Sequence, residues 1–408
     1  MSIRGERDAF HEVPLLLGKT PSKPAPAHLV NGFLRAAIGP GHAATSIRRL
    51  VVGSDKAGAL SSPPFDENLA SEESASSVRR DLRIILDPDR RSWEAMGSLF
   101  PLHGGLVSQD PSEEGLGTGL WRLIEPVEDG LRDLLCDLLY PDGTSSVDAV
   151  TALALVLADD PEVRRECVGA PPKQDSGHWP GEEDSLPVQF RQGLRDALMR
   201  VVQNASRRSR SSRLVSLTHA THFLAWLASL RSPAMARGAT LKGWGECEPL
   251  VVLSTLPPGL PDRPETRLAS LSYSRIIDEH RSALAHLMAR QIEGAPVSSQ
   301  IPQSEFNETR LRAALQPQVA GGLGSKDLTV IASLSSAWEQ AERLIELIYP
   351  GRYLESGFRS FGRKAGVVGP DRGAGAPRFV METNALALLV EMLVERGESV
   401  PFADWIDR

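Results

Sequence analysis

The sequence is poor in cysteine, with only Cys136, Cys167 and Cys247 among its 408 residues. They lie far apart, and no CxxC or CxH pair occurs, which argues against a zinc ribbon and a disulfide framework. Cys136 lies in the apolar run LRDLLCDLL, where a cysteine packs as a small hydrophobic residue. The shortage of cysteine is typical of a reducing compartment, and we expect a cytoplasmic protein.

Long hydrophobic runs are also missing. No window approaches 18 consecutive apolar residues, so the sequence predicts no transmembrane helix and no membrane partner. The N-terminus lacks the apolar core and small-residue cleavage site of a signal peptide. What is present is 41% hydrophobic and 24% charged residues, which is globular composition in a chain long enough for two or three domains.

Lysine is scarce: only 7 of the 45 basic residues are Lys, and the other 38 are Arg. This ratio is typical of a GC-rich bacterial genome. The alternative interpretation is that Arg is used for bidentate contacts to phosphate. The net charge of −7 argues against nucleic-acid binding by the whole surface, but it allows a local basic face.

Helical patterns dominate and predict a mainly α fold with a few short strands, built in several parts. We expect an N-terminal mainly helical region over 1–168 and a central helical region over 188–293, with one strand near 248–256. A C-terminal module follows over 326–408. Within the first region, residues 59–77 carry four acids and no base. This segment cannot bury enough apolar surface to order itself, and we expect a disordered or mobile loop.

Apolar residues at spacings of three and four predict the main helices. They are expected at 28–39, 120–140, 188–206, 212–231, 266–292 and 326–349. The helix over 266–292 is expected to place its larger apolar residues on one face. These are Leu268, Leu271, Ile276, Leu284 and Leu287.

Catalytic signatures are absent, because the sequence has no GxSxG elbow, no HExxH and no complete phosphate loop. The glycine-rich stretch GLGTGL (115–120) lacks a preceding apolar strand, so we interpret it as a flexible loop. His219 and His222 share a helix face but lack a third metal ligand, which favours a packed or surface pair. We therefore predict no catalytic residue, no metal site and no cofactor.

Two basic segments stand out. The first holds seven Arg and one acid between residues 189 and 213. Such a stretch is suited to a phosphate backbone, although cations are also favoured at a helix end. Its candidate nucleic-acid-binding residues are Arg207, Arg208, Arg210 and Arg213.

The second basic segment spans 351–380, where six bases meet two acids. A basic helix over 352–366 is followed by a predicted β-hairpin with a glycine-rich tip. In the order of its elements, residues 326–397 resemble a winged-helix domain. The resemblance implies that the helix enters the major groove and that the hairpin lies over the backbone. The residues it implicates in nucleic-acid binding are Arg359, Arg363, Lys364 and Arg372.

These patterns lead to one leading hypothesis. We expect a non-enzymatic, DNA-associated or adaptor subunit of a larger bacterial assembly, in a phage-defence or genome-maintenance complex. Its partners would be proteins of that complex and double-stranded DNA. Winged-helix modules also serve as protein docking units, so a pure protein–protein scaffold is an alternative. A further alternative is an enzyme whose site is assembled from distant residues, using Asp87, Asp89, His219, His222 and the GLGTG stretch.

Overall fold

The computed structural model describes twelve segments of the chain, which together hold fifteen helices and strands. The described residues are 26–38, 42–43, 108–109, 116–124, 130–139, 188–204, 210–238, 264–296, 303–315, 322–349, 355–369 and 376–393. Most of them are helical, and the strands form two short two-stranded sheets, which confirms a mainly helical chain with a few short strands. The predicted loop 59–77 and the predicted strand 248–256 lie outside the described residues.

The chain separates into two compact units. Helix α11 (Arg210–Gly238) begins in unit 2 and ends in unit 1, with the division between Leu224 and Ala225. The described part of unit 1 then continues to Glu382, and unit 2 resumes at Thr383. The three regions expected from the sequence stay a prediction.

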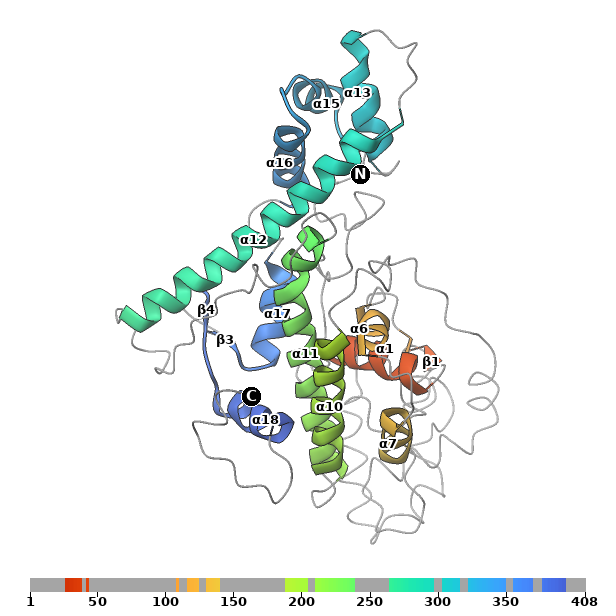
Figure 1. The fold of residues 1–408 in the computed structure, drawn as a ribbon, viewed down its shortest axis with the longest axis vertical. Coiled ribbons are helices and arrows are strands. Elements are labelled where there is room, and N and C mark those ends of the chain that lie inside the picture. Colours follow the sequence, from red (N-terminus) through yellow and green to blue (C-terminus); the bar gives the residue numbers. More distant parts are fainter. Residues whose placement is uncertain are drawn as a thin grey trace, which may run out of the picture. The chain divides into compact units, whose positions relative to one another are not determined.

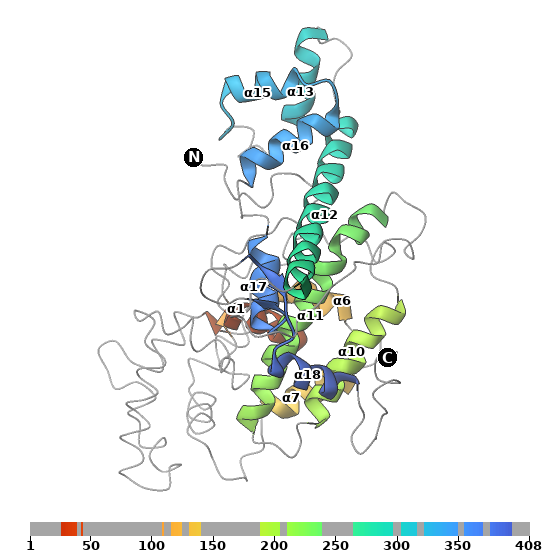
Figure 2. The same ribbon diagram turned by 90° about the vertical axis from the view of Figure 1, so that its left-hand side faces the viewer.

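Unit 1 is built around one long helix and a group of shorter elements (Figures 1 and 2). Its elements after α11 are α12 (Pro264–Gly294), α13 (Gln303–Ala314), α15 (Ser325–Ala332), α16 (Ala337–Ile348), α17 (Ser356–Lys364), β3 (Val368–Gly369) and β4 (Arg378–Phe379). Helix α16 runs beside α12, and α13 contacts both α12 and α15. Aliphatic side chains from these four helices form one core, which includes Leu284, Met288, Ile292, Leu311, Leu328, Ile331, Leu344, Ile345 and Ile348.

The long helix is confirmed, but the predicted buried side is correct only from Ile276 onward. Leu268 and Leu271 are exposed, whereas Ile276 and Leu284 are buried and Leu287 is half-buried. The start of α12 packs on β4 through small and aromatic residues instead. The buried residues over this stretch are Thr266, Ala269, Ser272, Tyr273, Ile276 and His280. The spacing of the leucines correctly predicts a helix. In its first turns, however, Leu268 and Leu271 lie on the solvent-exposed side and not on the buried one.

The predicted helix over 326–349 is two helices, α15 and α16, with a turn at residues 333–336. Ser336 is the N-cap of α16: its Oγ accepts a hydrogen bond from the Glu339 backbone N–H at 3.2 Å. Glu339 reaches back, and its Oε2 accepts from the N–H and the hydroxyl of Ser335 at 2.9 and 2.6 Å. These bonds satisfy the first donors of a new helix, so the chain restarts there.

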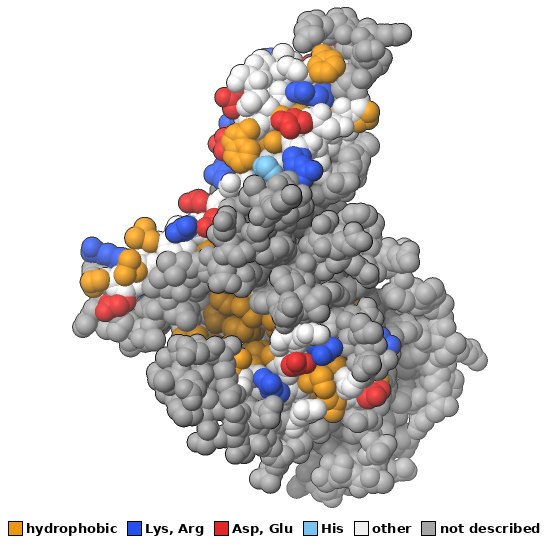
Figure 3. Space-filling view, in the orientation of Figure 1, with side chains coloured by type: hydrophobic (Ala, Val, Ile, Leu, Met, Phe, Trp, Pro, Cys, Tyr) orange, Lys and Arg blue, Asp and Glu red, His pale blue; other side chains and the backbone are white. Residues whose placement is uncertain are grey.

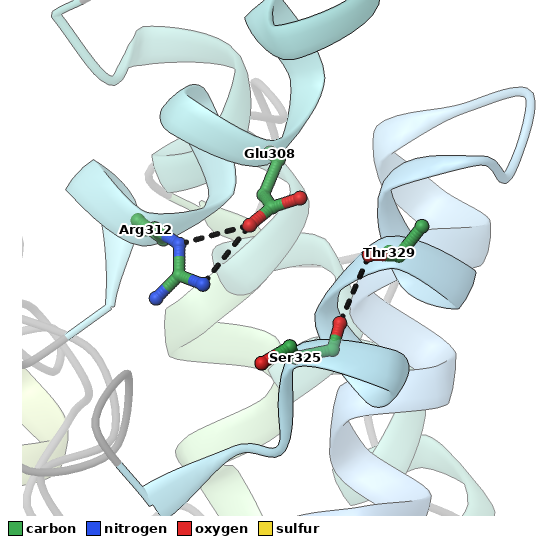
Figure 4. Close-up of polar contacts among 4 residues, drawn as sticks. All are labelled: Glu308, Arg312, Ser325 and Thr329. Carbon is green, nitrogen blue, oxygen red and sulfur yellow. Dashed lines mark hydrogen bonds and ion pairs between the residues drawn. The ribbon is translucent and has the colours of Figure 1, made fainter.

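The exposed faces of α13 and α15 hold contacts that stay within single helices, shown in Figure 4. Nε and Nη2 of Arg312 donate to Glu308 Oε1 at 3.1 and 2.9 Å, one turn apart on α13. On α15 the Thr329 hydroxyl donates to the Ser325 carbonyl at 2.9 Å. Exposed pairs of this kind stabilise a helix by about 0.3–0.5 kcal/mol, so the shared core determines how the helices pack.

The predicted β-hairpin is confirmed: β3 and β4 are antiparallel, with Val368 opposite Phe379 and Gly369 opposite Arg378. Helix α17 leads into it through a left-handed residue, Gly366, at φ 73°. The N–H of Gly366 donates to the Arg363 carbonyl at 3.1 Å, and the N–H of Val367 donates to the Gly362 carbonyl at 2.8 Å. This double closure is the Schellman motif, which turns the chain sharply after a helix.

Unit 2 holds the remaining described elements. They are α1 (Pro26–Ile38), β1 (His42–Ala43), β2 (Ser108–Gln109), α6 (Leu116–Ile124), α7 (Gly130–Leu139), α10 (Val188–Asn204), the start of α11 and α18 (Thr383–Leu393). Strands β1 and β2 pair in parallel. Phe33 of α1 and Trp121 of α6 meet edge to face, with ring centroids 5.5 Å apart.

The expected flexible loop GLGTGL is wrong for most of its length, because residues 116–120 form the start of α6. Glycine serves helix packing there. A Cβ on Gly117 would lie 2.5 Å from the Leu29 carbonyl oxygen and 2.6 Å from the Gly32 carbonyl carbon on α1. Only glycine lets the two helices approach this closely, which offsets its weak helix propensity.

Candidate functional site

Helix α17 carries most of the residues implicated by the winged-helix resemblance, and its apolar side is buried. Phe358 and Phe361 are both almost fully buried. The Phe358 ring lies 6.1 Å from Trp226 of α11, 5.8 Å from Tyr273 and 5.4 Å from His280 of α12. Phe379 of β4 completes the cluster, 6.1 Å from Phe358 and 5.4 Å from Tyr273.

A polar network lies beside this aromatic cluster. The Tyr273 hydroxyl donates to Glu355 Oε2 at 3.4 Å, across 82 residues of sequence. Glu355 Oε1 also lies 3.8 Å from Nη1 of Arg359, one helical turn further on. Burial first, and then the negative charge of Glu355, raise the pKa of the Tyr273 phenol far above its ordinary range. The phenol therefore stays protonated and acts as a hydrogen-bond donor to the carboxylate.

One of the basic residues expected to bind nucleic acid, Arg359, belongs to this network. The Arg359 side chain is only 20% exposed and forms the ion pair with Glu355. Arg363 is half-buried, whereas Lys364 is exposed. At 3.6 residues per turn, Arg359 and Arg363 share a face, and Lys364 points about 100° away from Arg363. The three bases therefore do not form one exposed face of α17.

The other candidate nucleic-acid-binding residues lie outside the described side chains. Arg207, Arg208 and Arg372 are outside the described residues. Arg210 and Arg213 fall in the first turn of α11, where only the backbone is described. Their roles in DNA contact stay predictions.

The two histidines of α11 lie in a packed stretch of unit 2. Nδ1 of His222 donates to the Thr218 carbonyl at 2.7 Å, and the ring is buried. Burial lowers the pKa of His219, which keeps its ring neutral at physiological pH. Among the residues that the structure describes, no group of three His, Cys, Asp or Glu could hold a metal ion. Asp87 and Asp89 lie outside those residues.

Exposed apolar side chains are the surface feature that sequence reasoning missed. On α12, Leu268 is 53% exposed and Leu271 is 65% exposed, one turn apart. Hydrophobic side chains are visible at that end of α12 in Figure 3. On α18, Leu386 and Val390 are 44% and 45% exposed, again one turn apart. Such side chains gathered on one helix face are typical of a surface that binds another protein.

No family model, no curated protein and no solved structure matches this chain. Within the described segments, no helix has the length and apolar character needed to cross a bilayer. Function is therefore inferred from the chain's own residues and the way they pack.

Proposed function

We propose that this protein is an adaptor subunit that binds a protein partner through the exposed start of α12. The observation that carries the proposal is the pair Leu268 and Leu271, both more than half exposed on the solvent side of a helix whose opposite side is buried. Fully burying one leucine side chain contributes about 1.5–3 kcal/mol, so covering both would supply a useful part of a binding energy.

The surroundings of the two leucines support a protein partner. Arg267 and Arg275 are exposed beside them, and Arg275 pairs with Glu279 at 3.3 Å. An apolar centre with charged residues at its edge, rich in arginine, is the usual composition of a protein–protein interface. The 31-residue helix, about 46 Å long, would present this surface on a rigid element. The predicted setting, a bacterial multi-protein assembly, agrees with this role.

A direct binding measurement tests the adaptor function. Full-length chain carrying Leu268→Ser and Leu271→Ser is compared with the wild type, and Val330→Ser on α15 is the control because Val330 is also more than half exposed. Proteins recovered with the wild type from the native host are purified and titrated by calorimetry. We expect the double variant to bind at least about tenfold more weakly, while the control binds like the wild type. Equal affinities for all three proteins would overturn the proposal.

DNA association is a second candidate function. The observation that favours it is the order of α17, β3 and β4, a basic helix followed by an antiparallel hairpin, together with the exposed Lys364 at the end of that helix. In a winged-helix arrangement the helix that carries Lys364 would enter the major groove, and Arg372 would lie over the phosphate backbone. The pairing of Arg359 with Glu355 leaves fewer cations for DNA than the sequence predicted, so the adaptor role is the better supported of the two.

A further inference from the structure

Two half-buried arginines of α17, Arg359 and Arg363, lie one turn apart on the same face of the helix. The Tyr273 phenol on α12 shows that both lie near one point. Burial and then the carboxylate of Glu355 raise the pKa of that phenol, whereas the positive charges of Arg359 and Arg363 act in the opposite direction. Both guanidinium groups are therefore within electrostatic reach of the same hydroxyl.

Glu355 holds Arg359 through a weak contact. Its Oε1 lies 3.8 Å from Nη1 of Arg359, which is an ion pair but is beyond hydrogen-bond distance. Nε of Arg359 is buried and has no hydrogen-bond partner among the residues that the structure describes. A guanidinium group has five N–H donors, so the contact with Glu355 leaves Arg359 with donors for an acceptor of better geometry.

We propose that Arg359 and Arg363 form a phosphate-binding pair, and that Glu355 occupies Arg359 in the protein alone as an autoinhibitory contact. Phosphate oxygens suit arginine because they accept two parallel N–H bonds from one guanidinium group. A carboxylate of the same chain competes with such a ligand for Arg359. The inference rests on DNA association, the second candidate function proposed above, and assigns Glu355 the role of limiting it.

The position of Glu355 lets Arg359 change partners while α17 stays folded. Glu355 is the N-cap residue of α17, but its side chain makes no capping hydrogen bond. The backbone bond from the Arg359 N–H to the Glu355 carbonyl, at 2.8 Å, does not involve the carboxylate. The Tyr273 hydroxyl donates to the other carboxylate oxygen at 3.4 Å. That bond continues to satisfy the carboxylate when the guanidinium group turns to a phosphate.

Neutralising Glu355 in the full-length chain tests the inference. Glu355→Gln keeps a side-chain oxygen for the Tyr273 hydroxyl and removes the charge that holds Arg359. We expect this variant to bind a labelled DNA duplex about fivefold more tightly than the wild type. The slope of log K against log salt should steepen by about 0.9, the value for one more phosphate contact. The control is Glu382→Gln, which removes the same charge at an exposed position of unit 1 and should show neither change.

Two further variants separate the release of Arg359 from a change in total charge or in folding. Glu355→Gln/Arg359→Gln removes both partners, so no buried charge is left unpaired, and it should bind like the wild type. Glu355→Asp keeps the charge but draws the carboxylate back by one carbon, and it should give a smaller gain in affinity than Glu355→Gln.

The outcomes distinguish this inference from DNA association itself. A wild type that binds DNA, with no gain in Glu355→Gln beyond that in Glu382→Gln, would overturn the autoinhibitory contact alone. A gain that survives in Glu355→Gln/Arg359→Gln would also overturn it, because Arg359 would not be the residue released. Absence of DNA binding by the wild type and all the variants would overturn both proposals and leave the adaptor function of α12 untouched.

Discussion

Gly117 lies where α6 crosses α1, and a side chain there would meet backbone atoms that cannot rotate away. The nearest atoms to an added methyl group would be the Leu29 carbonyl oxygen and the backbone of Gly32 and Phe33. Adding even one carbon would therefore force the two helices apart. The close packing of α6 on α1, and not a contact with phosphate, explains why this residue is glycine.

Replacing Gly117 by Ala should destabilise unit 2 by about 1–3 kcal/mol, the usual cost of overpacking a close contact. The matched control is Gly193→Ala on α10, where a Cβ would meet nothing within 4 Å. That change should stabilise the helix by up to about 1 kcal/mol, because alanine is the better helix former. Urea unfolding followed by circular dichroism measures both. If Gly117→Ala unfolds at the wild-type midpoint or above it, the close crossing is wrong.

Helix α16 begins where it does because Ser336 accepts a hydrogen bond from the Glu339 N–H while the Glu339 carboxylate accepts two hydrogen bonds from Ser335. Replacing Ser336 by Ala removes the cap and should destabilise the α15–α16 region by about 1 kcal/mol, as for other N-cap serines. Ser325→Ala is the control, since the side chain of Ser325 does not cap α15. Thermal unfolding of the three proteins measures the difference. If Ser336→Ala and Ser325→Ala lose the same stability, the Ser336 cap makes no specific contribution to it.

The same cap should depend on pH through Glu339. The hydrogen bonds from Ser335 lower the pKa of the Glu339 carboxyl below its ordinary value of 4.5. A lowered folded pKa means that the stabilisation is complete above the ordinary pKa and is lost as the pH falls through the folded one. The stability difference between the wild type and Glu339→Gln should therefore be constant near neutral pH and shrink below about pH 4. A difference that grows on acidification would contradict the assigned bonds.

The sequence predicted helices better than it predicted where they stop or which side they bury. The split of 326–349 had a local signal, because Ser336 and Glu339 form the S-x-x-E pattern of a capping box. The buried side of α12 had no such signal, because Leu268 and Leu271 lie at helical spacing but β4 packs against small and aromatic residues. Helix periodicity identifies the element, and tertiary packing then selects the face.

The candidate site was predictable only in part, for a similar reason. Phe358 and Phe361 lie three residues apart, a spacing that places them on one side of a helix, and both are buried. The pairing of Glu355 with Arg359 also had a local signal, since oppositely charged residues four apart meet on a helix. The contact of Tyr273 with Glu355 spans 82 residues, and no local pattern encodes it. Such long-range contacts explain why basic residues in a sequence need not form a basic surface.

The chain is acidic overall, so binding to DNA would require a local basic surface. The net charge of −7 opposes non-specific binding, so any affinity must come from a few concentrated cations. Lys364 is the exposed cation of α17, and Arg372 belongs to the segment between the two hairpin strands. Arg359 is unsuitable as a test position, because its removal would break the ion pair with Glu355 and mix binding with folding.

The double variant Lys364→Ala/Arg372→Ala should weaken duplex binding if these residues contact DNA. Each phosphate contact releases counterions, so losing both should lower the slope of log K against log salt by about 0.9 per contact. The control is Lys326→Ala, which removes an exposed lysine at the start of α15. Fluorescence anisotropy of a labelled duplex, measured across a salt series with all three proteins, gives the affinities and the slopes. A wild type and a double variant with the same affinity and the same slope would exclude DNA contact by this module. Its hairpin and helix would then serve packing within unit 1, and the exposed leucines of α12 would remain as the proposed binding surface.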